Sequence, residues 1–179
     1  FVLDDVEVTI NDNDAPGVTI EPTTVEISED GNTATYQVSL NSEPTAEVKV
    51  QVNVEDGQTT TKPPFLTFDN TNWNVKKTVT VYAEDDAIAE GLHKGTISHS
   101  VSSDDTNYQP DMFALDDVAV TINDNDAPGV TIEPTTVEVS EDGNTATYQV
   151  NLNSEPTAEV TIQINVEDGQ TTTKPPSLT

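Results

Sequence analysis

Cysteine, arginine and long apolar runs are all missing from this chain of 179 residues. Without cysteine there is neither a disulfide nor a thiolate metal site. No apolar run approaches the roughly 18 residues of a membrane-spanning helix, so we expect no membrane span in this segment. Only 6 basic residues, all lysine, face 33 acidic ones, and the net charge is −27. This excess argues against nucleic acid and anionic membranes as partners, because both attract basic patches.

Catalytic signatures are also missing. The chain has no Gly-x-Ser-x-Gly elbow, phosphate loop or dinucleotide fingerprint. Paired carboxylates can act as the acid and base of a glycosidase, but here they recur at strand ends with no sign of a shaped cleft. With no cysteine beside His93 and His99, we interpret both as ordinary strand residues rather than zinc ligands. We therefore expect no enzyme.

The chain does contain a long internal repeat. Residues 1–67 return as residues 113–179, a period of 112, and the two copies differ at only eight of 67 positions. A period of this length indicates an array of whole domains. We expect residues 1–14 to be the last strand and linker of a preceding repeat, residues 15–126 a complete repeat, and residues 127–179 the first half of the next.

The differences between the copies indicate β-strands. Around residues 47–55 valines alternate with polar residues, and the substitution Lys49/Thr161 falls on the polar parity. Val50/Ile162 and Val52/Ile164 fall on the apolar parity and keep a β-branched side chain, as a half-buried strand requires. Phe65/Ser177 does not fit this pattern.

Short alternating runs rich in Val, Thr, Ile and Tyr follow one another between turn residues, and no stretch has a helical period. We expect strands at 18–20 with 25–27, 34–40, 48–55, 65–68, 75–83, 95–101 and 118–122. About seven strands in some 110 residues are typical of an immunoglobulin-like β-sandwich. The predicted fold is therefore all-β, in tandem immunoglobulin-like sandwiches with a period of 112 residues.

Acidic residues concentrate where these strands end, in Glu29-Asp30, Glu55-Asp56, Glu84-Asp85-Asp86 with Glu90, and Asp124-Asn125-Asp126. Every second connection of a sandwich returns to the same end, so the clusters are expected to meet at one pole. The plainer alternative is a set of solvated acidic turns, above all at Asp-Gly pairs such as Asp168-Gly169. The surplus of acid is also compatible with a salty habitat or a need for solubility.

Three of these segments, SEDGN (28–32), EDDAIAE (84–90) and VTINDND (120–126), resemble the motifs of Calx-beta repeats. The linker NDNDAPG (11–17 and 123–129) resembles the calcium linker between cadherin domains. The resemblance implies an immunoglobulin-like fold that binds Ca²⁺ at one tip. The metal ligands it implies, with their counterparts in the linker and in the second copy, are Glu29, Asp56, Asp85, Asp86, Glu90, Asp124, Asp126, Asp12, Asp14, Glu141 and Asp168.

A cation is also expected on physical grounds. Carboxylates a few ångströms apart repel by roughly 1–4 kcal/mol per pair, depending on the dielectric. Ca²⁺ accepts many oxygen ligands in flexible geometry, whereas Mg²⁺ keeps more water. We expect Ca²⁺ to stiffen a stalk, fibre or matrix protein on the cell surface or secreted. Its partners would be neighbouring repeats, with lateral self-association a further option.

Two other functions stay open. One is a module for carbohydrate or protein ligands in a secreted protein, which predicts an exposed aromatic platform or a deep pocket away from the junction. Trp73 and Tyr82 are the aromatic candidates, although core roles suit them better. The other is a calcium sensor attached to a membrane segment. No Asn-x-Ser/Thr glycosylation signal occurs, which favours a bacterial source.

Overall fold

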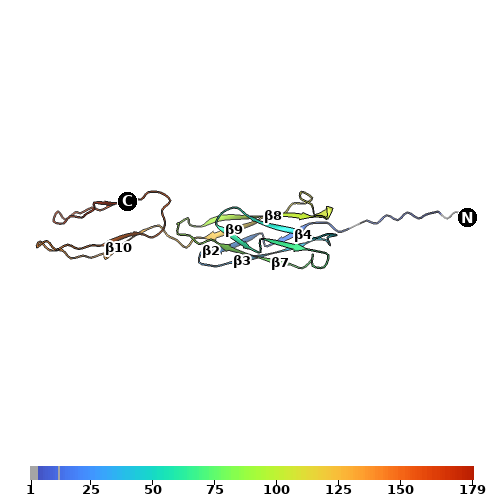
Figure 1. Cartoon of the computed structure of the whole chain (residues 1–179), viewed down its shortest axis with the longest axis horizontal. Coiled ribbons are helices and arrows are strands. Elements are labelled where there is room, and N and C mark those ends of the chain that lie inside the picture. The colour runs from blue at the N-terminus through green and yellow to red at the C-terminus, as the bar shows by residue number, and fades with distance from the viewer. Residues whose placement is uncertain (1–3, 12) are drawn as a thin grey trace.

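The computed structural model describes residues 4–11 and 13–179, and they form strands and loops with a single turn of 3₁₀ helix, η1 (Thr106–Tyr108). Nine strands make the central body and four short ones follow it (Figure 1). None of the helices in the described residues is long and apolar enough to cross a membrane. The strands are β1 (Val18–Glu21), β2 (Thr24–Ser28), β3 (Ala34–Leu40), β4 (Val48–Val54), β5 (Thr59–Lys62), β6 (Phe65–Phe68), β7 (Lys77–Ala83), β8 (His93–Ser103), β9 (Val118–Asn123), β10 (Val130–Glu133), β11 (Gln149–Leu152), β12 (Ile162–Gln163) and β13 (Ser177–Leu178).

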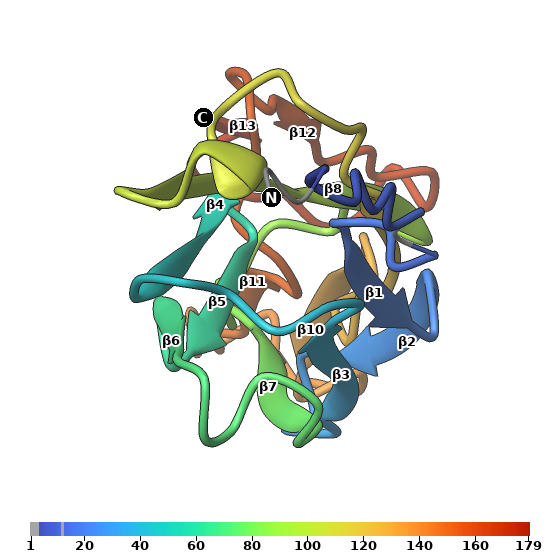
Figure 2. The same cartoon turned by 90° about the vertical axis from the view of Figure 1, so that its right-hand side faces the viewer.

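The central body is a two-layer sandwich. One sheet has the order β1-β3-β7-β5 and the other β2-β9-β8-β4-β6. The view along the long axis shows the layers end on (Figure 2). The neighbours β1 and β2 belong to different sheets, and β2 pairs parallel to β9 while the other pairs are antiparallel. This all-β architecture agrees with the predicted fold class.

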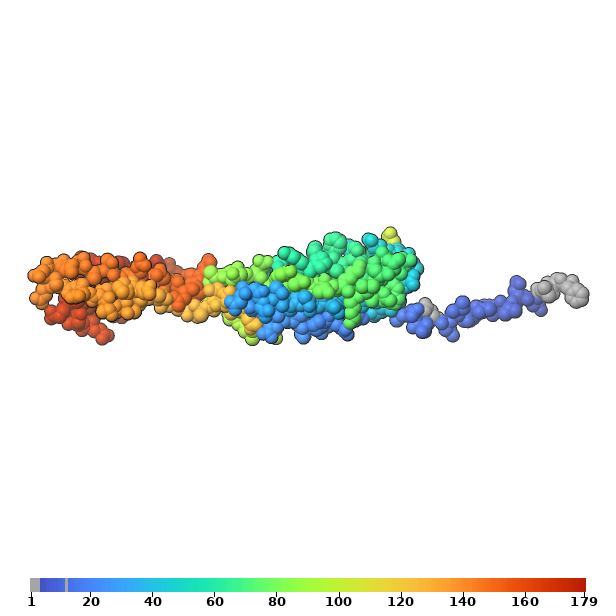
Figure 3. Space-filling model, turned by 90° about the horizontal axis from the view of Figure 1, so that it is seen from below, coloured from blue at the N-terminus to red at the C-terminus, as the bar shows by residue number. Residues whose placement is uncertain are grey.

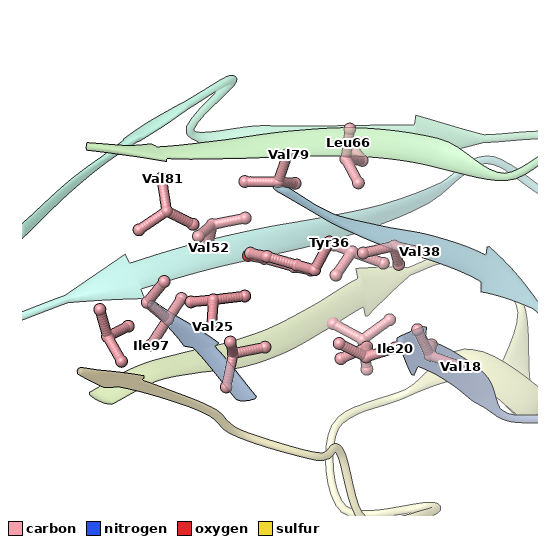
Figure 4. Close-up of a cluster of buried hydrophobic side chains, with 14 of the residues drawn as sticks. Val18, Ile20, Val25, Tyr36, Val38, Val52, Leu66, Val79, Val81 and Ile97 are labelled. Atoms are coloured by element: carbon pink, nitrogen blue, oxygen red, sulfur yellow. The ribbon is translucent and has the colours of Figure 1, made fainter. Parts of the chain in front are cut away.

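Alternation along each strand builds the core. In β3, Tyr36, Val38 and Leu40 are buried while the residues between them are not, because successive side chains point to opposite faces. Valine and isoleucine from both sheets meet between the layers (Figure 4). A buried pair also links the two sheets, since the Tyr36 hydroxyl lies 2.9 Å from His99 Nε2.

The predicted strands largely coincide with the observed ones. The prediction for residues 34–40 matches β3, whereas β7 begins two residues later than expected and β8 is longer at both ends. The prediction missed β5, Thr59–Lys62, because four polar residues carry no apolar alternation. Pairing with β7 makes this segment a strand.

Phe65/Ser177, the difference between the copies that had no sequence explanation, has a structural one. Phe65 on β6 is 44% exposed, and Lys49 Nζ lies 4.2 Å from the centre of its ring. In the second copy both partners change, to Thr161 and Ser177. A cation–π pair on the outer face of the sheet is thus lost as a unit.

The segment after the central body has the same apolar pattern but a different environment. β10 pairs with β11 and β12 with β13, in two sheets of two strands each. Ile20 on β1 is 2% exposed, whereas Ile132, 112 residues later on β10, is 45% exposed. The molecule is elongated, with this segment at one end and the N-terminal segment extended at the other (Figure 3).

Candidate cation site at the acidic pole

The parallel pairing of β2 with β9 brings the first two acidic clusters together. Ser28 is in register with Asn123, and the Glu29 N–H donates to the Asn123 carbonyl at 3.1 Å. Both strands therefore end at the same pole of the sandwich. Glu29 and Asp124, 95 residues apart in the sequence, emerge side by side.

A third cluster joins through the loop that leads into β8. His93 at the start of β8 is in register with Ile122 on β9, so the preceding loop lies beside Asp124. Asp124 Oδ2 accepts from the N–H groups of Glu90 at 2.5 Å and Gly91 at 2.6 Å. The loop is therefore held in place by one carboxylate oxygen.

Two overlapping groups of potential metal ligands result, and we call this region the acidic pole. Glu29, Asp124 and Asp126 form one, and Glu29, Glu90 and His93 the other. Within each group the ligand atoms all lie within 4.8 Å of one another. Glu29 is only 5% exposed, and its Oε1 has no hydrogen-bond partner among the described residues. Asp126 Oδ2 is likewise buried without a partner there.

The pKa shifts at this pole reflect crowding. Burial raises the pKa of Glu29 above its ordinary value of 4.5, and the neighbouring charges of Asp124 and Asp86 add to the rise. Burial and the charge of Asp124 also raise the pKa of Asp126. The pKa of Asp124 is lowered, chiefly because the N–H groups of Asp126 and Gly91 donate to it. Two carboxylates here thus hold a charge at a free-energy cost.

The remaining acidic residues of this pole stand around the two groups. Asp85 Oδ1 accepts from the Asn125 side chain at 3.2 Å, and Asp86 Oδ1 from the Ile88 N–H at 2.7 Å. Asp56 instead closes its own turn, because it accepts from the N–H groups of Gln58 and Thr59. These three carboxylates lie outside the two close groups of the described residues.

The other predicted ligands lie elsewhere. Asp12 is outside the described residues, and Asp14 is exposed in the N-terminal segment. In the second copy Asp168 repeats the turn of Asp56, since it accepts from the N–H groups of Gln170 and Thr171. Glu141 is exposed, and the close groups in the described part of the chain include neither it nor Asp168.

The second unit reaches the acidic pole through Glu155 rather than Glu141. The Glu155 N–H donates to the Ala87 carbonyl at 2.6 Å, and Glu155 forms a parallel bridge with Ile88. Glu141 occupies the place that Glu29 has in the first copy, at the far end of its own strand. The strand direction, which the sequence pattern does not specify, decides which residue meets the loop.

His93 is the site residue that the sequence interpretation set aside. Its Nε2 lies 3.7 Å from Glu90 Oε2. The prediction began this strand at residue 95, which left His93 in the preceding turn, whereas β8 begins at His93. Its place three residues after Glu90 was the available signal.

The pKa shifts predict an unusual dependence of stability on pH. Glu29, with a raised pKa, adds stability below its ordinary value of 4.5 and loses that contribution as the pH rises through its folded-state pKa. Asp124, with a lowered pKa, contributes above 3.8 and loses its contribution as the pH falls through its folded-state pKa. In chelator, the urea midpoint should therefore be higher at about pH 5 than at pH 7, and fall again below about pH 3.8.

Relief of the general negative charge would act in the same direction, so the control is Glu29→Gln measured at the same two pH values. The variant should gain less than the original chain between pH 7 and pH 5. An equal gain would show that Glu29 does not carry the effect.

No protein-family model and no curated protein sequence matches this chain. Among solved structures, calcium binding domain CBD12 of CALX1.1 is 16% identical, with a TM-score of 0.46 over 70% of this chain and 53% of that one. The apo form of the Calx CBD1 domain is 15% identical, with a TM-score of 0.44 over 61% and 96% of the two chains. The periplasmic chaperone SfaE is 14% identical, with a TM-score of 0.45, and the chain spans 58% of its length. Similarity this low carries no functional argument.

Proposed function

We propose that this chain is a non-enzymatic segment of an extracellular structural or adhesive protein, such as a stalk, fibre or matrix, in which Ca²⁺ at the acidic pole stiffens a row of sandwiches. One observation carries the proposal: buried Glu29 converges with Asp124 and Asp126, and two of their oxygens lack hydrogen-bond partners among the described residues. Ca²⁺ suits such a site, because it takes six to eight oxygen ligands at flexible angles.

The charges of the pole favour the same ion. The carboxylates of Glu29, Asp124 and Asp126 raise one another's cost of ionisation, and no lysine is among the causes of their pKa shifts. A divalent cation would relieve this repulsion and satisfy the buried oxygens together. The resemblance of residues 28–32, 84–90 and 120–126 to Calx-beta motifs supports the choice of calcium.

Stiffening follows from the position of the loop before β8. At one point this loop donates two N–H groups to Asp124, and at another its Ala87 carbonyl accepts from Glu155 of the next unit. A cation that fixes Asp124 would therefore also hold the segment that touches the neighbour. The partners in this proposal are neighbouring units of the same protein.

A module for carbohydrate or protein ligands is less well supported. The opposite pole has a hollow of about 500 Å³, lined by residues 43–47 with Asp69 and Asn70, and no aromatic side chain lines it. Trp73 is half-buried and packs against the core. The aromatic platform that such a module predicts has no counterpart at this hollow.

Small-angle X-ray scattering of the whole chain, in about 10 mM calcium and in chelator, tests the proposal. This concentration lies well above the roughly 10⁻⁴–10⁻³ M at which extracellular modules bind calcium. We expect a narrower, more extended distance distribution with calcium, and the variant Asp85→Ala with Asp86→Ala should lose much of that change. Superimposable profiles with and without calcium would overturn the stiffening role.

A further inference from the structure

His93 has an unused ring nitrogen that faces the acidic pole. Its Nδ1 lies 2.9 Å from the Gly91 carbonyl oxygen. A carbonyl can only accept, so Nδ1 carries the hydrogen and donates it. The other nitrogen, Nε2, is buried and has no hydrogen-bond partner among the described residues. This is the arrangement of a metal-binding histidine, whose second nitrogen is held by a backbone carbonyl.

Two carboxylates stand opposite that nitrogen. Ligand atoms of His93, Glu29 and Glu90 lie within 4.8 Å of one another. Glu29 is 95% buried, since 5% of it is exposed, and its Oε1 has no partner in the described part of the chain. Glu90 Oε2 is held by the Gln58 side chain at 2.8 Å, which fixes its direction.

A simple ion pair accounts for this geometry poorly. If His93 were protonated at Nε2, it would be expected to donate to Glu90 Oε2, but the two atoms are 3.7 Å apart, too far for a hydrogen bond. Ligands bound at about 2.0–2.2 Å to one ion stand some 3–4 Å from each other. The observed distance therefore fits two ligands of one cation better.

We propose that Glu29, Glu90 and His93 form a second cation site, which takes a first-row transition metal dication such as Zn²⁺. The proposal rests on the calcium site proposed above, because Glu29 belongs to both groups. Imidazole nitrogen suits zinc and its neighbours in the first row, whereas Ca²⁺ prefers ligand sets made of oxygen. The pole is then a pair of adjacent sites with different ion preferences.

Such an ion would tie three segments together. Glu29 follows β2, Glu90 lies in the loop that touches the second unit, and His93 begins β8. The mixed site thus adds a cross-link between the two ends of that loop and the strand beside it. In a chain without cysteine, it would take the place of a disulfide at this pole.

Cobalt is a suitable probe, because Co²⁺ occupies sites of this type and absorbs visible light. The whole chain is titrated with Co²⁺ in saturating calcium, and binding is followed by absorption and by ¹⁵N NMR of the imidazole nitrogens. We expect visible bands and a shift of His93 Nε2. His99 is the internal control, because its Nε2 lies 2.9 Å from the Tyr36 hydroxyl and should not respond.

The matched variants are His93→Gln and Lys94→Gln, on adjacent residues of β8. His93→Gln should weaken Co²⁺ binding at least tenfold. Lys94→Gln should leave it unchanged, and both variants should keep the thermal response to calcium. Equal Co²⁺ affinity in His93→Gln, or no NMR shift of His93 in the original chain, would overturn the mixed site. Loss of the calcium response in the original chain would instead overturn the calcium site, so the two failures are distinguishable.

Discussion

Saturating calcium should raise the melting temperature of this chain by about 10 °C or more, and chelator should reverse the change. An ion present at 100 times its Kd adds about 2.7 kcal/mol per independent site, provided that it binds only the folded chain. For a domain of about 100 residues, each kcal/mol shifts the melting temperature by roughly 4–8 °C. The measurement is differential scanning calorimetry in about 10 mM calcium and in chelator.

The size of this effect follows from the state of the pole without a cation. Glu29 Oε1 and Asp126 Oδ2 are buried with no hydrogen-bond partner in the described residues, and the pKa values of both carboxyl groups are raised. Calcium removes a cost that the apo fold already carries and adds new bonds to oxygen. Asp126→Asn should weaken the response strongly, because it removes one of these carboxylates. A shift of the same size in Asp126→Asn would contradict this assignment.

Glu29→Gln should invert the usual sign of a site mutation. Without calcium the variant should melt about 4–8 °C higher than the original chain, because the neutral amide removes a buried charge beside Asp124, a gain of about 1 kcal/mol. With calcium it should melt lower, because a ligand common to both groups is lost. The two melting curves should therefore change their order when calcium is added.

The neighbouring residue supplies the control for Glu29→Gln. Asp30→Asn removes the same charge one position later, at a side chain that is exposed. Its apo stability should change by less than about 0.5 kcal/mol, and its calcium response should stay close to that of the original chain. If Glu29→Gln proves less stable than the original chain in chelator, the charge of Glu29 is not a burden on the apo fold.

The strands and most of the acidic pole could be predicted from the sequence. Alternation of apolar and polar residues is a local property, so β3 was predicted at residues 34–40, where it lies. The expectation that Glu29, Glu90, Asp124 and Asp126 meet at one pole followed from the alternating direction of sandwich strands. The structure brings these four residues together.

The rest depended on partners far away in the chain. The four residues of β5 are polar, and pairing with β7 makes them a strand. His93 joins the pole because β8 begins two residues earlier than predicted and pairs with β9. Glu155 meets the loop before β8 because of how the second unit is oriented. Register and strand direction are properties of pairs of segments, so neither segment specifies them alone.

The two copies separate these contributions most clearly. Ile20 and Ile132 lie in identical local sequence, Val-Thr-Ile-Glu-Pro, and each sits on a short strand paired with its counterpart 18–20 residues ahead. Ile20 is 2% exposed and Ile132 45%. Local sequence alone determined the strand, its inward-facing parity and its antiparallel partner. The second sheet that covers Ile20 decided its burial, because the hydrophobic effect acts only on surface that other parts of the fold remove from water.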